Sequence, residues 1–132
     1  SSRYGAMPGK WRTAHTPYLR EPLDAAADPT VEAVGFMKCS RIGGTEWGNN
    51  ILAWTCSERP MPIMYTQPEK DDVVDELRGR IRSLFEDSEK LRPLIPDRNW
   101  VHDNKLELAT CDIYGAWATH DEAQDDRRGF LR

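Results

Sequence analysis

Residues 38–45 carry the side chains of this sequence that are best suited to do chemistry. They read KCSRIGGT, with Lys38 at the front, Arg41 inside the segment, and Gly43, Gly44 and Thr45 at its end. A phosphate group is best held by successive backbone N–H groups at the N-terminus of a helix, and glycines let the backbone approach it closely. The segment therefore predicts a phosphate-binding loop in which the Thr45 hydroxyl is a ligand for Mg²⁺.

The spacing departs from the usual form of such a loop, G-x-x-x-x-G-K-[ST]. Gly43 and Thr45 keep their places, but Gly44 stands where the lysine is usual, and Lys38 stands at the front. A lysine can still reach the β/γ-phosphates from there, since its ammonium group acts as a point charge on a flexible stem. The residues alone leave a second reading open, which is a Gly-Gly turn between a buried strand and a helix, with Lys38 and Arg41 solvated.

A phosphate loop of this kind needs a strand before it and a helix after it. Residues 31–37 are apolar and β-branched enough to predict a buried strand of a parallel sheet. After Thr45, helical spacing relates Trp47, Ile51, Leu52 and Trp54, and residues 61–66 form a second short apolar run. Strand, helix and strand within about thirty-five residues predict a βαβ unit with a right-handed crossover.

The rest of the chain predicts further helices and strands around that unit. Residues 69–91 predict a long amphipathic helix, because the i, i+4 rule relates Val73, Leu77, Ile81 and Phe85. Residues 106–111 and 113–117 alternate as two strands of a hairpin, and residues 18–27 predict a short helix that Pro22 limits. The predicted fold class is α/β, with a mainly parallel sheet flanked by helices.

The composition of the sequence indicates which class of protein it belongs to. The chain has 132 residues, of which 39% are hydrophobic and 30% charged, as in soluble globular proteins. The net charge of −4 argues against binding to nucleic acid over the whole surface, although the first twenty residues contain four basic side chains and no carboxylate. The three widely spaced cysteines match no metal-site spacing and predict reduced thiols. No apolar run approaches the roughly eighteen residues that span a bilayer.

Several stretches together resemble one protein family. The chain is similar, over about residues 8–120, to the large terminase subunit of tailed bacteriophages in the lambda-like branch. Four stretches carry this similarity: WRTAHTPYLREPLDA, MKCSRIGGTEWGNN, IMYTQPEKDD and IYGAWAT. A lysine-first phosphate loop is typical of that branch, so the resemblance favours the phosphate-loop reading. It implies a partial P-loop NTPase domain of the ASCE-like type over residues 18–132, with the nuclease domain absent. Residues 1–17, which are rich in Gly, Pro, Ser and Arg, predict an extended arm before this domain.

The resemblance also implies an ATP-driven motor that packages viral DNA. Carried over by position, Lys38 and Arg41 would be catalytic, with Lys38 on the phosphates and Arg41 on the γ-phosphate charge. The implied nucleotide-binding set is Tyr18, Lys38, Cys39, Ser40, Arg41, Ile42, Gly43, Gly44 and Thr45, with Tyr18 near the adenine and Thr45 on Mg²⁺. The expected cofactors are ATP and Mg²⁺. The expected partners are double-stranded viral DNA, the small terminase subunit, the portal of the procapsid and further copies of the chain, in the host cytoplasm and without a membrane.

Members of this family continue into an apolar strand that ends in Asp-Glu, the pair that completes Mg²⁺ ligation and orients the attacking water. The sequence ends in RRGFLR about where that strand is expected. Asp121 and Glu122 imitate the pair, but they come too early and follow the polar Thr119 and His120. Without such a pair we expect ATP binding with poor hydrolysis, since phosphoryl transfer depends on positioning and electrostatic stabilisation. The alternative is a non-catalytic fragment that binds only DNA or a protein partner.

Overall fold

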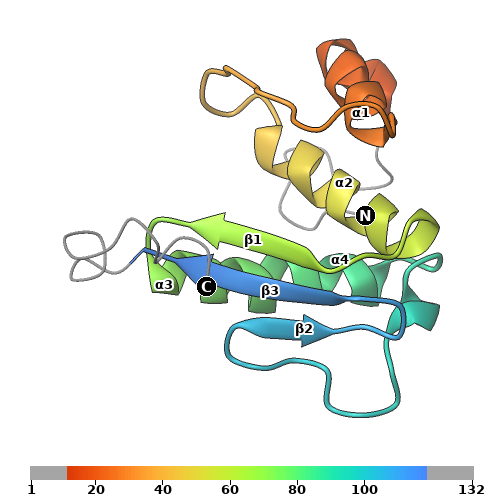
Figure 1. The fold of residues 1–132 in the computed structure, drawn as a ribbon, viewed down its shortest axis with the longest axis vertical. Coiled ribbons are helices and arrows are strands. Elements are labelled where there is room, and N and C mark those ends of the chain that lie inside the picture. The colour runs from red at the N-terminus through yellow and green to blue at the C-terminus, as the bar shows by residue number, and fades with distance from the viewer. Residues whose placement is uncertain (1–11, 119–132) are drawn as a thin grey trace.

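The computed structural model describes residues 12–118, in which one long helix, α2 (Gly44–Glu58), joins two parts of the molecule (Figure 1). One part holds two 3₁₀ turns and a short helix: η1 (Thr13–His15), η2 (Pro17–Leu19) and α1 (Arg20–Ala27). The other part is a small sheet with the remaining helices. Pro22 lies in the first turn of α1, where a proline costs no intrahelical hydrogen bond.

The sheet has three strands in the order β1-β3-β2. β1 (Ile63–Gln67) pairs in parallel with β3 (Asp112–Trp117), and β2 (Lys105–Glu107) pairs antiparallel with β3. The predicted hairpin is therefore confirmed. The predicted mainly parallel character is not confirmed for residues 12–118, since the sheet there contains one parallel and one antiparallel pair of strands.

A single continuous helix covers one face of the sheet, where Figure 1 shows α3 and α4 behind the strands. It consists of α3 (Lys70–Glu76), a π-helical turn η3 (Leu77–Ile81) and α4 (Arg82–Asp87). This confirms most of the helix predicted at residues 69–91. The helix ends earlier than predicted because Ser88 is extended, and the 3₁₀ turn η4 (Arg92–Leu94) follows after a short break.

The core lies between this helix, the sheet and the C-terminal half of α2. The buried residues of the cluster include Leu52 and Cys56 of α2, Val73, Leu77, Ile81 and Phe85 of the long helix, and Leu106 and Ile113 of the sheet. The helical spacing thus identified the buried face correctly. Gly115 allows the close approach of helix and strand, since a Cβ there would lie 2.4 Å from Val73 Cγ1 and 2.8 Å from Leu77 Cδ1.

The strand predicted at residues 31–37 does not form, so the predicted βαβ unit is wrong. These residues are irregular, and the side chain of Met37 is fully exposed. An apolar, β-branched run favours extended backbone, but a strand also needs a neighbour to complete its hydrogen bonds. Its expected neighbour, β1, pairs with β3 instead. The segment is held near α2 by Phe36, whose ring centroid lies 5.5 Å from that of Trp47.

The predicted extended arm lies mostly outside the described residues, which begin at residue 12. Within its last part, Thr13–His15 forms a 3₁₀ turn, and Pro17 begins the next one. Backbone hydrogen bonds from His15 N to Arg12 O and from Thr16 N to Thr13 O close the first turn at 3.0 and 3.1 Å, and Leu19 N to Thr16 O closes the second at 3.0 Å. The end of the predicted arm is therefore helical rather than extended.

Candidate phosphate-binding site

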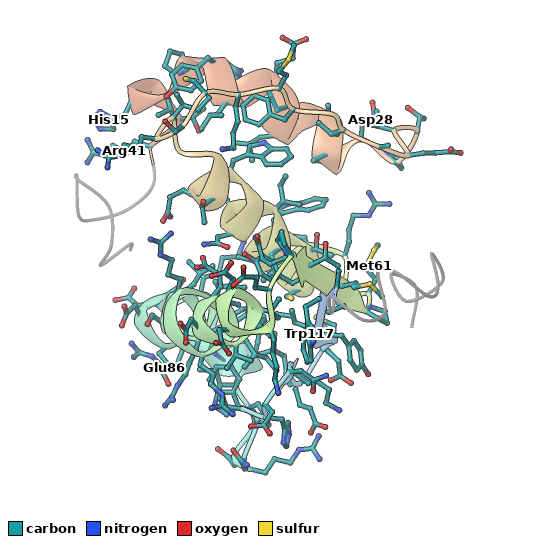
Figure 2. The ribbon with its side chains drawn as sticks, turned by 90° about the vertical axis from the view of Figure 1, so that its left-hand side faces the viewer. His15, Asp28, Arg41, Met61, Glu86 and Trp117 are labelled. Carbon is teal, nitrogen blue, oxygen red and sulfur yellow. The ribbon has the colours of Figure 1, made fainter. Side chains whose placement is uncertain are left out.

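The loop of residues 38–43 lies where the N-terminal part of the chain meets the start of α2. Figure 2 shows Arg41 in the upper part of the molecule and Glu86, which is on the helix that covers the sheet, in the lower part. Two residues of the loop have left-handed backbone conformations, Arg41 with φ 62° and Gly43 with φ 84°. Turns of this kind point successive N–H groups to one side, which forms a concavity that binds anions. A positive φ is unfavourable for a residue other than glycine, so the backbone at Arg41 is strained. Strain of this kind is typical of functional loops.

The N-terminus of α2 has no side-chain cap. Its N-cap residue is Gly43, which makes no side-chain hydrogen bond to the first turn. The first intrahelical bond runs from Trp47 N to Gly43 O at 2.8 Å, so the amides before Trp47 have no partner inside the helix. These donors and the positive end of the helix dipole favour a bound anion.

Lys38 lies across the loop and reaches the start of this helix. A Cβ added at Gly44 would lie 2.3 Å from Lys38 Cε and 3.2 Å from Lys38 Nζ. The lysine at the front of the loop therefore brings its ammonium group to Gly44, the position that holds the lysine in the usual motif. The structure thus brings together Lys38 and the open amides of α2.

The N-terminal part supports the loop through η2. The Tyr18 hydroxyl donates a hydrogen bond of 3.1 Å to the carbonyl oxygen of Ile42. The next residue, Leu19, is fully buried, and its Cδ1 lies 3.5 Å from where a Cβ of Gly43 would be. The Tyr18 residue is 53% exposed beside the loop.

The remaining predicted site residues are on the surface. Cys39, Ser40, Arg41 and Thr45 are exposed, and Thr45 is the second residue of α2. Its hydroxyl suits Mg²⁺, which usually takes few protein ligands and completes its shell with water and phosphate oxygens. Asp121 and Glu122 lie outside the described residues.

Two features are missing from residues 12–118. No group of three or more His, Cys, Asp or Glu side chains is arranged to hold a metal ion. No helix in this part of the chain is both long enough and apolar enough to cross a membrane.

A buried polar contact helps to place α2, and sequence reasoning missed it. Asn49 of α2 is only 5% exposed, and its side chain lies close enough to the Glu76 carboxylate, at the end of α3, to influence its pKa. Burial raises the pKa of Glu76 above its ordinary value, against the lowering effects of Arg80 and Asn49. Asn49 gave no signal in the sequence, because an asparagine in an amphipathic helix normally lies on the solvated face.

Comparison with known proteins identifies the family. A family model described as phage terminase large subunit gpA, ATPase domain, matches residues 5–120. No curated protein and no solved structure was found to match the chain. Since the family match covers most of the sequence, the chain belongs to the phage terminase large subunit family, and its residues 5–120 match the ATPase domain of that family. This confirms the resemblance seen in the four sequence stretches.

Proposed function

We propose that this chain binds ATP and Mg²⁺ at residues 38–45 and, in the complete terminase, couples ATP hydrolysis to movement of double-stranded viral DNA into the procapsid. The observation that carries the proposal is the position of Lys38 over Gly44, at the uncapped N-terminus of α2. An ammonium group, open backbone amides and a helix dipole meet there, and all three favour a polyphosphate.

The site residues then have separate roles. Lys38 would hold the β/γ-phosphates, and the amides that follow Gly43 would surround them. Arg41, exposed within the loop, would stabilise the negative charge that spreads over the γ-phosphate oxygens during transfer. Thr45 would be a Mg²⁺ ligand, and the bound ion would neutralise phosphate charge. Cys39, Ser40 and Ile42 would contribute backbone groups.

Tyr18 would bind the other end of the nucleotide. Its hydroxyl donates a hydrogen bond to the Ile42 carbonyl, while the residue as a whole is 53% exposed beside the loop. An aromatic face held in one orientation offers a stacking surface for a purine at low entropic cost. The adenine of ATP is the proposed partner of this face.

The proposal includes the wider assembly that the family implies. The proposed partners are viral DNA, the small terminase subunit, the portal of the procapsid and further copies of this chain, in the host cytoplasm. A second candidate function is a non-catalytic module that binds only DNA or a protein partner. One observation favours it, which is that residues 31–37 form no strand behind the loop.

The two candidates differ in what Mg-ATP does to stability. If the loop binds ATP, free nucleotide at ten times its Kd should stabilise the chain by about 1.4 kcal/mol, which is a rise in melting temperature of roughly 5 °C for this length. Differential scanning fluorimetry measures this rise. Mg-AMP is the matched control, since it has the base but lacks the β/γ-phosphates, and we expect a much smaller rise with it. No shift at millimolar Mg-ATP would favour the non-catalytic module.

The position of Lys38 makes Gly44→Ala a specific test of the phosphate contact. The new methyl group would occupy the space of Lys38 Cδ and Cε, which belong to the flexible end of an exposed side chain. The protein should therefore fold, with its ammonium displaced from the helix start. We expect Mg-ATP affinity to fall about tenfold, as measured by isothermal titration calorimetry, which corresponds to roughly 1.4 kcal/mol.

Gly48→Ala is the control for this variant. It lies in the same helix, and a Cβ there would have no neighbouring atom within 4 Å. Alanine favours a helix over glycine by up to about 1 kcal/mol, so this variant should melt slightly higher and bind Mg-ATP with unchanged affinity. Equal affinities for the two variants would show that Lys38 takes no part in binding.

A further inference from the structure

Two cysteines from distant parts of the sequence meet in the core. Cys56 lies in the last turns of α2, and Cys111 immediately precedes β3, 55 positions later. The thiol of Cys111 donates a hydrogen bond to Cys56, with the two Sγ atoms 3.0 Å apart. Both residues are free thiols in the structure. Their widely separated positions gave no sign in the sequence that they form a pair.

We propose that Cys56 and Cys111 form a reversible disulfide, which gives this chain an oxidised state in which the C-terminal end of α2 is bonded to the start of β3. A disulfide bond is about 2.05 Å long, so the two sulfur atoms need to approach by only about 1 Å. The surrounding backbone is already fixed, because Thr110 Oγ1 donates a hydrogen bond of 2.9 Å to the Cys56 carbonyl oxygen. Little of the core would have to move.

The reaction needs an oxidant, and a small-molecule disulfide such as oxidised glutathione supplies it. The Cys111 thiolate would attack one sulfur of that molecule, because Cys111 is 9% exposed and Cys56 is 0% exposed. This step forms a mixed disulfide and releases one glutathione thiolate. The Cys56 sulfur then attacks Cys111 Sγ and its proton passes to the departing glutathione sulfur, which forms the internal bond and releases the second glutathione as a thiol. Two protein thiols are oxidised, and one small disulfide is reduced to two thiols.

The surroundings of Cys56 and Cys111 determine how fast the internal disulfide forms. Burial, followed by the hydrogen bond and the charge of Cys111, raises the pKa of the Cys56 thiol well above its ordinary value. The thiolate is the reactive form, so closure should be slow at neutral pH and faster as the pH rises. Cys39 is exposed and should react earlier, giving only mixed disulfides or links between chains.

The test is incubation of the folded chain with oxidised glutathione at pH 7 and pH 8.5, in a Cys39→Ser background that removes the exposed thiol. Peptide mapping without reduction should find Cys56 linked to Cys111, with faster formation at the higher pH. The melting temperature should rise by at least about 5 °C, because the bond closes a long loop in the unfolded chain. Dithiothreitol should reverse both changes.

Cys56→Ala and Cys111→Ala, each in the same background, are the matched controls. Neither should form an internal link or gain stability on oxidation. The proposal is overturned if the Cys56–Cys111 peptide is missing after oxidation of the folded chain, or if the same rise in melting temperature occurs in either alanine variant. The peptide map of the parent chain decides the question even if an alanine variant fails to fold.

Discussion

In the Lys38→Ala variant, Mg-ATP is expected to raise the melting temperature by less than about 1.5 °C, under conditions that give the parent chain roughly 5 °C. A hydrogen bond to a charged group contributes about 1.5–3 kcal/mol, so the loss of the ammonium group should weaken binding about ten- to a hundredfold. Scanning fluorimetry measures the shift, and calorimetric titration gives the change in Kd. Without nucleotide the variant should melt close to the parent chain, because Lys38 is exposed.

Lys90→Ala is the control for the removal of a surface lysine. The Lys90 ammonium lies 2.5 Å from Glu58 Oε1, at the opposite end of α2 from the loop. Its replacement should cost at most about 1 kcal/mol of stability and leave the Mg-ATP shift unchanged, since exposed ion pairs contribute little. A full Mg-ATP shift in Lys38→Ala would mean that the loop does not hold the phosphates.

Phe85→Ala is expected to have the largest effect on stability, with a loss of about 3–5 kcal/mol in the free energy of unfolding. Phe85 is fully buried in α4, and its ring packs edge-on against Trp100 with the centroids 6.5 Å apart. Alanine would leave a cavity between the long helix and the sheet. Urea denaturation should show a lower midpoint with an unchanged slope. A loss of this size is a large share of the 5–15 kcal/mol that stabilises a typical domain.

The loss of stability in Phe36→Ala, compared with that in Phe85→Ala, tests where the core lies. Phe36 is only half-buried, and its ring packs against Trp47 rather than against the sheet. Its truncation should cost roughly 1 kcal/mol, the scale of a single aromatic pair. Equal losses in Phe36→Ala and Phe85→Ala would contradict a core centred on the long helix and the sheet.

The sequence predicted those parts of the fold that depend on local pattern. The i, i+4 spacing from Val73 to Phe85 identified the buried face of a helix, and alternation identified the hairpin of β2 and β3. Residues 31–37 were predicted wrongly because the same local pattern says that a segment can be extended but not which strand it will pair with. The position of β1 at the sheet edge likewise depends on contacts with β3, about fifty residues away.

For the candidate site too, some features could be predicted from the sequence and others could not. The loop residues 38–45 could be predicted from the sequence because they are consecutive, and because the glycines and the threonine follow a known order. Two contacts could not be predicted from the sequence, because both depend on how the loop folds. They are the packing of the Lys38 side chain over Gly44 and the hydrogen bond from Tyr18 to Ile42. The Cys56–Cys111 pair was hidden for the same reason, and the cysteines appeared in the sequence as unrelated thiols.

The single long helix that joins the two parts of the molecule has a mechanical consequence. With 15 residues α2 is about 22 Å long, and its far end is fixed in the core by Leu52, Ala53 and Cys56. If α2 pivots by about 5° around that fixed end, Gly44 swings along an arc of about 2 Å, which is enough to make or break a hydrogen bond. A ligand that displaced Gly44 by about 2 Å would thus tilt α2 by about 5° relative to the sheet.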